Sequence, residues 1–419
     1  MHWRGWVRSR LMIEMGDRPR DLSSLVVPQH GSLEATGDPF EPYRLEDPDG
    51  VVVAPVAAYL RDLQACGRPA TTQRSYGMDL LRWFRFLRAA GAGWDQATRV
   101  EARDFISWLQ VTGKPRRPAG GTGGVNSVTG KPVPRDTYAP ATVAHCETVL
   151  RSFYEFHLEA GSGPMVNPFP LARDRRHGRP LAHHNPMLPW RAERSGRYRP
   201  RVAQRVPRQI PDEKFGELFA ALGSHRDRAL VSLWVSSGAR ASELLGATCA
   251  DSDPGQQLIT VIRKGSRVMQ QLPASPDAFV WLRLYQAQTQ GLVPARPDDP
   301  LWWTLRKPFR PLAYHAARAM FVRANSSLGA NWSLHDLRHT AAYRMARDPQ
   351  MPITDVQWVL GHAHLSTTQQ YLNPLPEDVI ASVLAHYARQ AEGVSAPADG
   401  IRLDYRPESL SVLFGKDLQ

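Results

Sequence analysis

Apolar and polar residues follow each other along the first half of the chain with the spacing of α-helices. From residue 71 to 87 the apolar side chains recur every three or four positions, so they share one helix face, and Thr71 and Thr72 are candidate N-cap residues. The same spacing predicts helices from Ala102 to Gln110 and from Ala141 to Ala160. These three helices, each with a wide apolar face, predict a small helical bundle.

In the second half of the chain, two short runs rich in apolar and β-branched residues interrupt the helical patterns. The runs, Leu258 to Ile262 and Val268 to Leu272, flank Lys264-Gly265-Ser266, a typical sequence for the turn of a β-hairpin. The predicted fold class is therefore mainly α (α+β), with a small antiparallel sheet in this half. The helices predicted here span residues 212–221, 226–236, 241–245, 313–324, 335–347, 353–360 and 377–389.

Three segments lack the periodicity of regular structure. Residues 1–51 mix Pro, Gly and charged side chains and are interpreted as an N-terminal extension of unassigned role. Residues 113–137 are polar and rich in Gly and Pro, which predicts a long loop between the second and third helices. Residues 391–419 are interpreted as a C-terminal tail.

The charge of the chain favours a polyanionic partner. Its 419 residues carry a formal net charge of +12, and such a field attracts nucleic acid or an anionic membrane surface. Between Arg173 and Arg208 there are eleven Arg, opposed only by Asp174 and Glu193. Because each phosphate contact releases counterions, a segment of this kind would make binding steeply salt-dependent. We interpret residues 171–209 as a basic linker on DNA, and a solvated linker that contacts nothing is the alternative.

The remaining composition argues against membrane and secreted proteins. No apolar run approaches the roughly 20 residues that span a bilayer, and the N-terminal segment MHWRGWVRSR lacks the apolar core of a signal peptide, so we expect a cytoplasmic protein. The three cysteines, Cys66, Cys146 and Cys249, are odd in number and far apart. They argue against a disulfide framework and are interpreted as buried small apolar groups.

Two arginines and a histidine occur where phosphate chemistry would need them. Guanidinium groups match the oxygens of a phosphate, and Arg240, in the segment GARASEL, lies near a predicted helix start, where an anion is also favoured. His335 and Arg338, in the segment LHDLRHT, are three residues apart and so project from one face of the predicted helix. These positions predict a site that holds a phosphate.

A lysine, a second histidine and a tyrosine complete the candidate site. Lys264 lies in the predicted hairpin turn and can release a proton, which an arginine cannot. The segment LGHAHLSTTQQYL contains His362 and Tyr371, and Gly361 suits a helix C-cap that turns the histidine into the site. No metal-ligand motif, paired acidic cluster or Gly-rich phosphate loop accompanies them, so we expect no metal and no cofactor.

In identity, order and local context these residues resemble the catalytic residues of the tyrosine recombinase (phage-type integrase) family. The resemblance is strong from residue 205 to 390; from 52 to 170 the chain is more weakly similar to the core-binding, SAM-like domain of integrases. The six residues that carry it are Arg240, Lys264, His335, Arg338, His362 and Tyr371. The organisation that it implies is an extension (1–51), a helical core-binding domain (52–170), a basic linker (171–209), a catalytic domain (210–390) and a tail (391–419).

The resemblance also implies a mechanism and a role for each residue. Tyr371 would attack a DNA phosphate and form a 3′-phosphotyrosyl bond, while Lys264 protonates the departing 5′ oxygen. We expect the positive charge of two Arg and a Lys to favour the phenolate of Tyr371. The phosphate would be held by Arg240 and Arg338, and His335 and His362 would donate to it or manage the proton of the tyrosine.

Four further residues near the motifs receive supporting roles. Glu243 and Asp336 are expected to orient the Arg and His side chains. His339 is interpreted as indirect support for the site, and His364 as a surface or DNA-facing neighbour.

The implied function is site-specific recombination of DNA, for which alternatives remain open. The expected partners are double-stranded DNA, three further copies in a homo-tetramer on paired DNA sites and, as a candidate, an accessory DNA-bending protein, with no membrane partner. The long extension and the loop at residues 113–137 favour the integrase of a mobile element over an Xer-like resolvase of chromosome or plasmid dimers. A type IB topoisomerase and a catalytically idle DNA-binding homologue are further alternatives.

Overall fold

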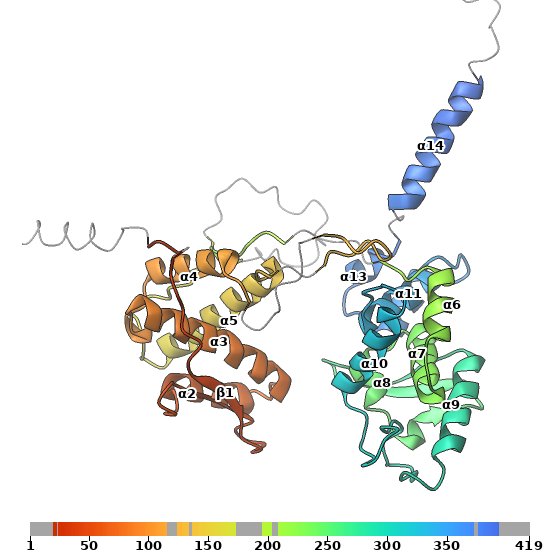
Figure 1. Ribbon diagram of the computed structural model, residues 1–419, viewed down its shortest axis with the longest axis horizontal. Coiled ribbons are helices and arrows are strands. Elements are labelled where there is room, and N and C mark those ends of the chain that lie inside the picture. The colour runs from red at the N-terminus through yellow and green to blue at the C-terminus, as the bar shows by residue number, and fades with distance from the viewer. Residues whose placement is uncertain are drawn as a thin grey trace, which may run out of the picture. The chain divides into compact units, whose positions relative to one another are not determined.

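The chain folds into two compact units, Met1–Arg205 and Val206–Gln419, which are described separately below. The structure is a computed structural model (Figure 1). It describes residues 20–22, 24–114, 124–133, 136–172, 195–202, 208–372 and 376–393.

A β-hairpin precedes the helices of the first unit. Its strands β1 (Ser32–Ala35) and β2 (Tyr43–Glu46) are antiparallel, with Leu33 opposite Leu45. Leu45 is buried, and the hairpin packs beside α2 and α3 (Figure 1). The N-terminal extension predicted from the sequence therefore contains regular structure. Its four-residue strands are too short for an alternating pattern to stand out.

Four α-helices and one 3₁₀ turn follow the hairpin in the described part of the first unit. Helix α3 starts directly after Pro69, whose extended backbone forms the N-cap, so the prediction of Thr71 or Thr72 as the cap is wrong. Helix α4 starts three residues earlier than predicted because Thr98 and Glu101 form a capping box. The helices are α2 (Ala54–Ala65), α3 (Ala70–Ala90), α4 (Arg99–Val111) and α5 (Pro140–Glu159), with a 3₁₀ turn at Trp94–Gln96.

The core of the first unit is aromatic. Trp83 of α3 and Phe105 of α4 pack edge to face, with ring centroids 5.0 Å apart. The indole N–H of Trp83 donates a hydrogen bond of 2.9 Å to the hydroxyl of Tyr154 on α5. The bundle thus buries large rings while satisfying their polar atoms.

The second unit is built around α7 (His225–Ser237), a helix with nearly all of its residues buried. Helices α9 and α11 pack against α7, and the short sheet contacts it through β5. The sheet has the order β3-β4-β5, from Ser252–Asp253, Leu258–Ile262 and Met269–Pro273. The other helices are α6 (Asp212–Ala220), α8 (Ala241–Leu245), α9 (Pro276–Thr289), α10 (Tyr314–Ser326), α11 (Leu334–Ala346), α12 (Ile353–Leu360), α13 (Leu365–Gln369) and α14 (Pro376–Gly393).

These elements confirm the predicted fold class, a mainly helical protein with small antiparallel sheets. The hairpin of β4 and β5 lies within one residue of its predicted position. Helix α9 was not predicted, because apolar residues occur on more than one of its faces: Phe279 and Leu282 are buried, whereas Val280 and Leu284 are exposed. Its sequence consequently lacks a single apolar stripe.

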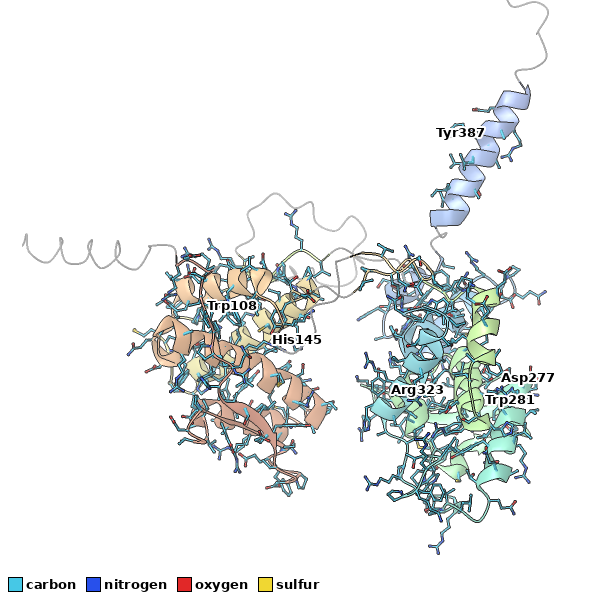
Figure 2. The ribbon with its side chains drawn as sticks, viewed as in Figure 1. Trp108, His145, Asp277, Trp281, Arg323 and Tyr387 are labelled. Carbon is cyan, nitrogen blue, oxygen red and sulfur yellow. The ribbon has the colours of Figure 1, made fainter. Side chains whose placement is uncertain are left out.

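The three cysteines differ in their burial. Cys146 is buried and Cys249 partly buried, but Cys66 is exposed, so its interpretation as a buried apolar group is wrong. Most of the basic linker, part of the loop at residues 113–137 and nearly all of the tail lie outside the described residues. Tyr387 stands exposed on α14 (Figure 2). No helix in the described ranges is both long enough and apolar enough to cross a membrane.

Candidate active site

The turn from α7 to α8 places Arg240. Helix α7 ends in Gly238, whose φ of 63° is left-handed, and two residues later Arg240 begins α8 as its N-cap. A side chain at Gly238 would place its Cβ 3.0 Å from Leu360, so the turn lies tightly against α12. Arg240 therefore occupies a helix start, as its sequence context predicted, and its side chain is 29% exposed.

Glu243 connects Arg240 to the hairpin. Its carboxylate accepts hydrogen bonds from the guanidinium of Arg240 at 2.8 Å, from the backbone N–H of Arg240 at 2.9 Å and from the backbone N–H of Lys264 at 2.9 Å. Burial acts to raise the pKa of this carboxyl, but the donated hydrogen bonds outweigh it and hold the pKa below its usual value. Glu243 is thus a charged anchor that orients Arg240, which agrees with its expected role.

The side chain of Lys264 is exposed at the tip of the hairpin. The turn between β4 and β5 contains Gly265 at φ 106° and Arg267 at φ 60°, and the N–H of Arg267 donates to the carbonyl of Arg263 at 3.0 Å. Lys264 is joined to the rest of the site through its backbone bond to Glu243. Its ammonium group is therefore carried by a fixed backbone and projects from an exposed turn.

Arg338 on α11 is the buried centre of the site, with 2% of its surface exposed. Its guanidinium donates to the carbonyl of Gly238 at 2.6 Å and to that of Leu360 at 2.5 Å. Burial, and then the charge of Arg240, lower its pKa to about 10, so it remains a cation at neutral pH. The guanidinium of Arg338 therefore connects the C-terminal ends of α7 and α12 by hydrogen bonds.

His362 follows Gly361, which ends α12 with a left-handed φ of 60°, as the sequence predicted. The Nε2 atom of His362 lies 3.1 Å from a guanidinium nitrogen of Arg338, and its Nδ1 atom lies 2.9 Å from the hydroxyl of Thr368. Since an arginine only donates, Nε2 accepts and the proton is on Nδ1. Burial, followed by the charges of Arg338 and Arg240, lowers the pKa of His362 to about 4. Donation from Nε2 to a phosphate would require this arrangement to open.

Tyr371 lies just after α13 and packs into the site with 3% of its surface exposed. Its hydroxyl oxygen is 2.8 Å from Nδ1 of His339, one residue after Arg338 on α11. The ring stacks on His362 with centroids 6.3 Å apart and meets Tyr343 edge to face at 5.3 Å. His339 was expected to support the site only indirectly, and this is wrong, because its ring contacts the phenol itself.

The pKa of Tyr371 lies above its usual value. Burial raises it to about 12, although Arg338 and Arg240 act in the opposite direction. Arg338 and Arg240 favour the phenolate, as expected, but desolvation of the charged oxygen outweighs their attraction, so the net shift is upward. The phenol is neutral at physiological pH, so as a nucleophile it would need a proton acceptor.

The structure brings together most of the six predicted residues. Arg338, His362 and Tyr371 lie in one cluster with Arg240 nearby, as the electrostatic influence of Arg240 on all three shows. His335 is exposed and packs its ring against His339, with centroids 4.3 Å apart. Asp336 accepts hydrogen bonds from the N–H and hydroxyl of Ser333, which caps α11.

Sequence reasoning missed two contributors to the site, Arg263 and Thr368. Arg263 is buried and donates to Glu243 at 3.1 Å, and Thr368 fixes the ring of His362. The position of Arg263 next to Lys264 gave a hint, but an arginine in a hairpin is ordinarily exposed. Thr368 lies in the predicted segment before Tyr371, without a pattern that would have distinguished it from its neighbour Thr367.

Two family models match the chain. Residues 210–377 match the phage integrase family, and residues 56–118 match the N-terminal SAM-like domain of phage integrases. The two matches together cover more than half of the chain and contain all six candidate residues.

Curated relatives include recombinases of two kinds. The tyrosine recombinase XerD of Pseudomonas aeruginosa is 31% identical over 181 residues, which are 41% of this chain and 59% of XerD. This chain thus spans less than two thirds of the XerD sequence. Transposase A from transposon Tn554 of Staphylococcus aureus is 23% identical over 350 residues, which are 80% of this chain and 91% of the transposase.

Solved structures share the fold. A lambda integrase dimer bound to a COC′ core site has a TM-score of 0.53 at 14% identity, covering 88% of this chain and 85% of that one. The Tn1549 transposon integrase in complex with circular intermediate DNA has a TM-score of 0.52 at 13% identity, covering 79% of this chain and 98% of that one.

Proposed function

Because this chain belongs to the tyrosine recombinase (phage integrase) family, as its six residues predicted, we propose that it is a site-specific recombinase that cleaves and rejoins DNA through a 3′-phosphotyrosyl intermediate. The observation that carries the proposal is the contact cluster of Tyr371, His339, His362 and Arg338. In the proposal, Tyr371 is the nucleophile, His339 accepts its proton and Arg338 is the buried cation beside them.

The cleavage step needs only groups of the protein and DNA. Tyr371 donates its proton to Nδ1 of His339 while its oxygen attacks the phosphorus, and the bond from phosphorus to the 5′ oxygen breaks. Lys264 gives a proton to that 5′ oxygen. In the rejoining step a 5′ hydroxyl attacks the phosphotyrosyl bond, Lys264 takes the proton back, and His339 returns one to Tyr371. The phosphotyrosyl bond keeps the phosphodiester energy, so no external energy source is needed.

The cations stabilise the transition state. Negative charge grows on the two non-bridging oxygens of the phosphate as Tyr371 attacks, and guanidinium groups with fixed positions stabilise it more there than in the ground state. Arg240 is oriented by Glu243, and Arg338 by the carbonyls of Gly238 and Leu360. His362, once released from Arg338, and the exposed His335 complete the set of donors around the phosphate.

The proposed domains follow the predicted boundaries (extension 1–51, core-binding domain 52–170, linker 171–209, catalytic domain 210–390 and tail 391–419), with one change in the extension. The compact units and the ranges of the two family matches support this division. The hairpin β1–β2 packs on the helices of the core-binding unit, which favours counting residues 32–46 with that domain.

The proposed partner is double-stranded DNA, bound by a homo-tetramer on paired sites, with an accessory DNA-bending protein as a candidate. The Tn1549 integrase is described in complex with circular intermediate DNA and the lambda integrase as a dimer bound to a core site, which supports a DNA partner and more than one copy. The Tn554 transposase aligns over 80% of this chain, against 41% for XerD, which favours a mobile element over dimer resolution.

The Tyr371→Phe variant tests the proposal. Wild-type protein is incubated with a pool of nicked duplexes of random sequence. Cleavage close to a nick releases a short fragment that diffuses away, so the strand cannot be rejoined and the protein stays covalently attached. We expect wild-type protein and Tyr314→Phe, which changes an exposed tyrosine of α10, to form complexes that survive denaturing gels. Tyr371→Phe should form none while retaining DNA binding. An adduct with Tyr371→Phe would rule out the assignment, and sequencing of the trapped DNA gives the cleavage point.

A further inference from the structure

Arg263 is a buried cation next to the exposed Lys264. It has 4% of its surface exposed, although it directly follows β4 at the turn of the hairpin. Burial lowers its pKa, and the carboxylate of Glu243 acts in the opposite direction. A charge in such a place is costly unless its hydrogen bonds are satisfied.

The guanidinium of Arg263 is satisfied by three separate parts of the second unit. Its Nε donates to the side-chain oxygen of Gln270 on β5 at 2.6 Å, and Nη1 donates to Glu243 on α8 at 3.1 Å. Its Nη2 donates to the carbonyl of Val359 and, at 3.5 Å, to that of Trp358 on α12. Because the guanidinium is planar and rigid, these bonds fix α8, the hairpin and the end of α12 relative to one another.

Gln270 adds a second bond between the hairpin and α12. Its side-chain N–H₂ donates to the carbonyl of Trp358 at 2.9 Å while its oxygen accepts from Arg263. The residue after β4 and a residue of β5 are thereby both hydrogen-bonded to the end of α12. We call Arg263 and Gln270 the hairpin anchor.

The anchor lies directly against the turn that precedes His362. A Cβ atom built on Gly361 would be 3.0 Å from Nε and 3.1 Å from Cζ of Arg263, so the backbone approaches the plane of the guanidinium closely. The same arginine therefore lies between the turn that carries Lys264 and the turn that carries His362.

We propose that Arg263, with Gln270, is a positioning residue that holds the Lys264 turn where its ammonium group reaches the 5′ oxygen of the cleaved bond. This inference rests on the proposed function. A general acid must come within about 3 Å of the atom that it protonates, and a displacement of about 1 Å can cost roughly 100-fold in rate. The backbone of Lys264 already shares the carboxylate of Glu243 with Arg263. Without the guanidinium, the side-chain hydrogen bonds described between the hairpin and α8 or α12 would be reduced to that bond and the bond of Gln270 to Trp358.

The test compares two leaving groups in the Arg263→Met variant. One duplex has the natural phosphate at the mapped cleavage point, and the other has sulfur in place of the 5′ bridging oxygen. Sulfur leaves as a thiolate and needs no proton, so this substrate bypasses Lys264. Lys264→Ala provides the benchmark, because it should be slow on the oxygen substrate and close to wild type on the sulfur substrate.

We expect Arg263→Met to follow the same pattern, with cleavage slowed by about 100-fold on oxygen and by less than about 5-fold on sulfur. The double variant with Lys264→Ala should be little slower than Lys264→Ala alone, because both changes act on one step. An equal loss on both substrates, or no loss on either, would overturn the proposal. Absence of any adduct with the wild-type protein would instead reject the proposed function.

Two further variants and a control guard against a simple loss of folding. Gln270→Leu removes the second half of the anchor at a half-buried position and should give a smaller defect with the same relief by sulfur. Arg263→Lys keeps the charge without the fork and should lie between wild type and Arg263→Met. Arg283→Met removes an exposed arginine of α9 and should leave the ratio of oxygen to sulfur rates unchanged. A defect of Gln270→Leu that is equal on both substrates would also contradict the proposal.

Discussion

Burial and positive charge act against each other on the phenol of Tyr371. The charges of Arg338 and Arg240 act to lower its pKa. Burial acts to raise the pKa and has the larger effect, so the pKa is about 12. At pH 7 only roughly one phenol in 10⁵ is then ionised, so in the proposed mechanism a nearby proton acceptor decides the rate of attack. The histidine within hydrogen-bond distance of that oxygen is His339, whereas His335 contacts His339 through its ring.

The His339→Ala variant should lose cleavage activity while keeping DNA binding. Loss of a positioned proton acceptor typically costs about 10²- to 10⁴-fold in rate. Without His339, attack depends on ionisation of Tyr371 by solvent, so the rate should keep rising between about pH 7 and 10, more steeply than for the wild-type protein. Charged and titratable groups facing this contact are Tyr343, His335, His362, Arg338 and Arg240. The measurement is the single-turnover rate of adduct formation against pH.

Added imidazole separates a chemical role from a structural one. It should restore part of the His339→Ala activity, because a free base can enter the space left by the ring. The control is His30→Ala, at an exposed position of the first unit. Its cleavage rate should equal that of the wild-type protein, both with and without imidazole. If His339→Ala cleaves at the wild-type rate, His339 is not the acceptor.

The contribution of individual residues was predictable where the motif is local. Arg240 at a helix start and Gly361 at a helix end follow from neighbouring residues, and both occupy those positions. The contact of His339 with Tyr371 joins residues 32 positions apart, and the burial of Arg263 depends on α12. Neither was predictable, because both depend on how α11, α12 and the hairpin pack.

At the level of elements, two left-handed turns bring the site together. Gly238 ends α7 before Arg240, and Gly361 ends α12 before His362. Arg338 of α11 donates to the carbonyls of Gly238 and Leu360, so one side chain joins both helix ends. The site therefore depends on helix termini that converge on α11, and less on the interiors of the helices.

Gly361→Ala should damage the site more than a comparable glycine change elsewhere. The backbone at Gly361 is left-handed, and a Cβ atom would also come within 3.0 Å of the buried Arg263. Strain alone costs about 1 kcal/mol, and displacement of the guanidinium adds to it. Gly291→Ala is the matched control, because Gly291 has φ 74° and no atom within 4 Å of its added Cβ.

Urea unfolding and cleavage assays distinguish the two glycine variants. We expect Gly291→Ala to lose about 1 kcal/mol of stability with normal cleavage, and Gly361→Ala to lose more stability and at least about 10-fold in cleavage rate. Equal effects of the two substitutions would show that the contact with Arg263 is unimportant.

Helices and strands were predictable where their apolar residues lie on a single face. Most predicted helices of the second unit end within about two residues of their expected ends, for example α12 at Ile353–Leu360, whereas α14 continues four residues beyond its predicted end, to Gly393. Helices with apolar residues on several faces, such as α9, and short strands, such as β1, escaped prediction because their patterns resemble those of loops or buried runs.

At the scale of the whole molecule, the proposed function combines the two compact units with a surplus of positive charge. The catalytic candidates are confined to the second unit, and the match to the SAM-like domain lies in the first. The arginines at positions 173–208 connect them in sequence and hold much of the net charge of +12. The structure of most of that segment lies outside the described residues, so its role rests on sequence alone.

Replacing linker arginines should reduce the salt dependence of DNA binding. If Arg173, Arg175, Arg176 and Arg179 each neutralise a phosphate, changing all four to Gln should make the slope of log K against log salt less negative by about 0.9 per contact. A variant with only two of these changes should lose about half as much. Binding titrations at several salt concentrations measure the slope, and an unchanged slope would mean that this segment does not contact DNA.

Mapping the covalent adduct tests the central claim most directly. The trapped complex is digested with protease and nuclease, and the remaining nucleotide-linked peptide is identified by mass spectrometry. The proposed function predicts that the peptide contains Tyr371, linked through its oxygen to the 3′ phosphate of the DNA, and that the other DNA end carries a free 5′ hydroxyl. A nucleotide on any other residue, or a link to a 5′ phosphate, would contradict it.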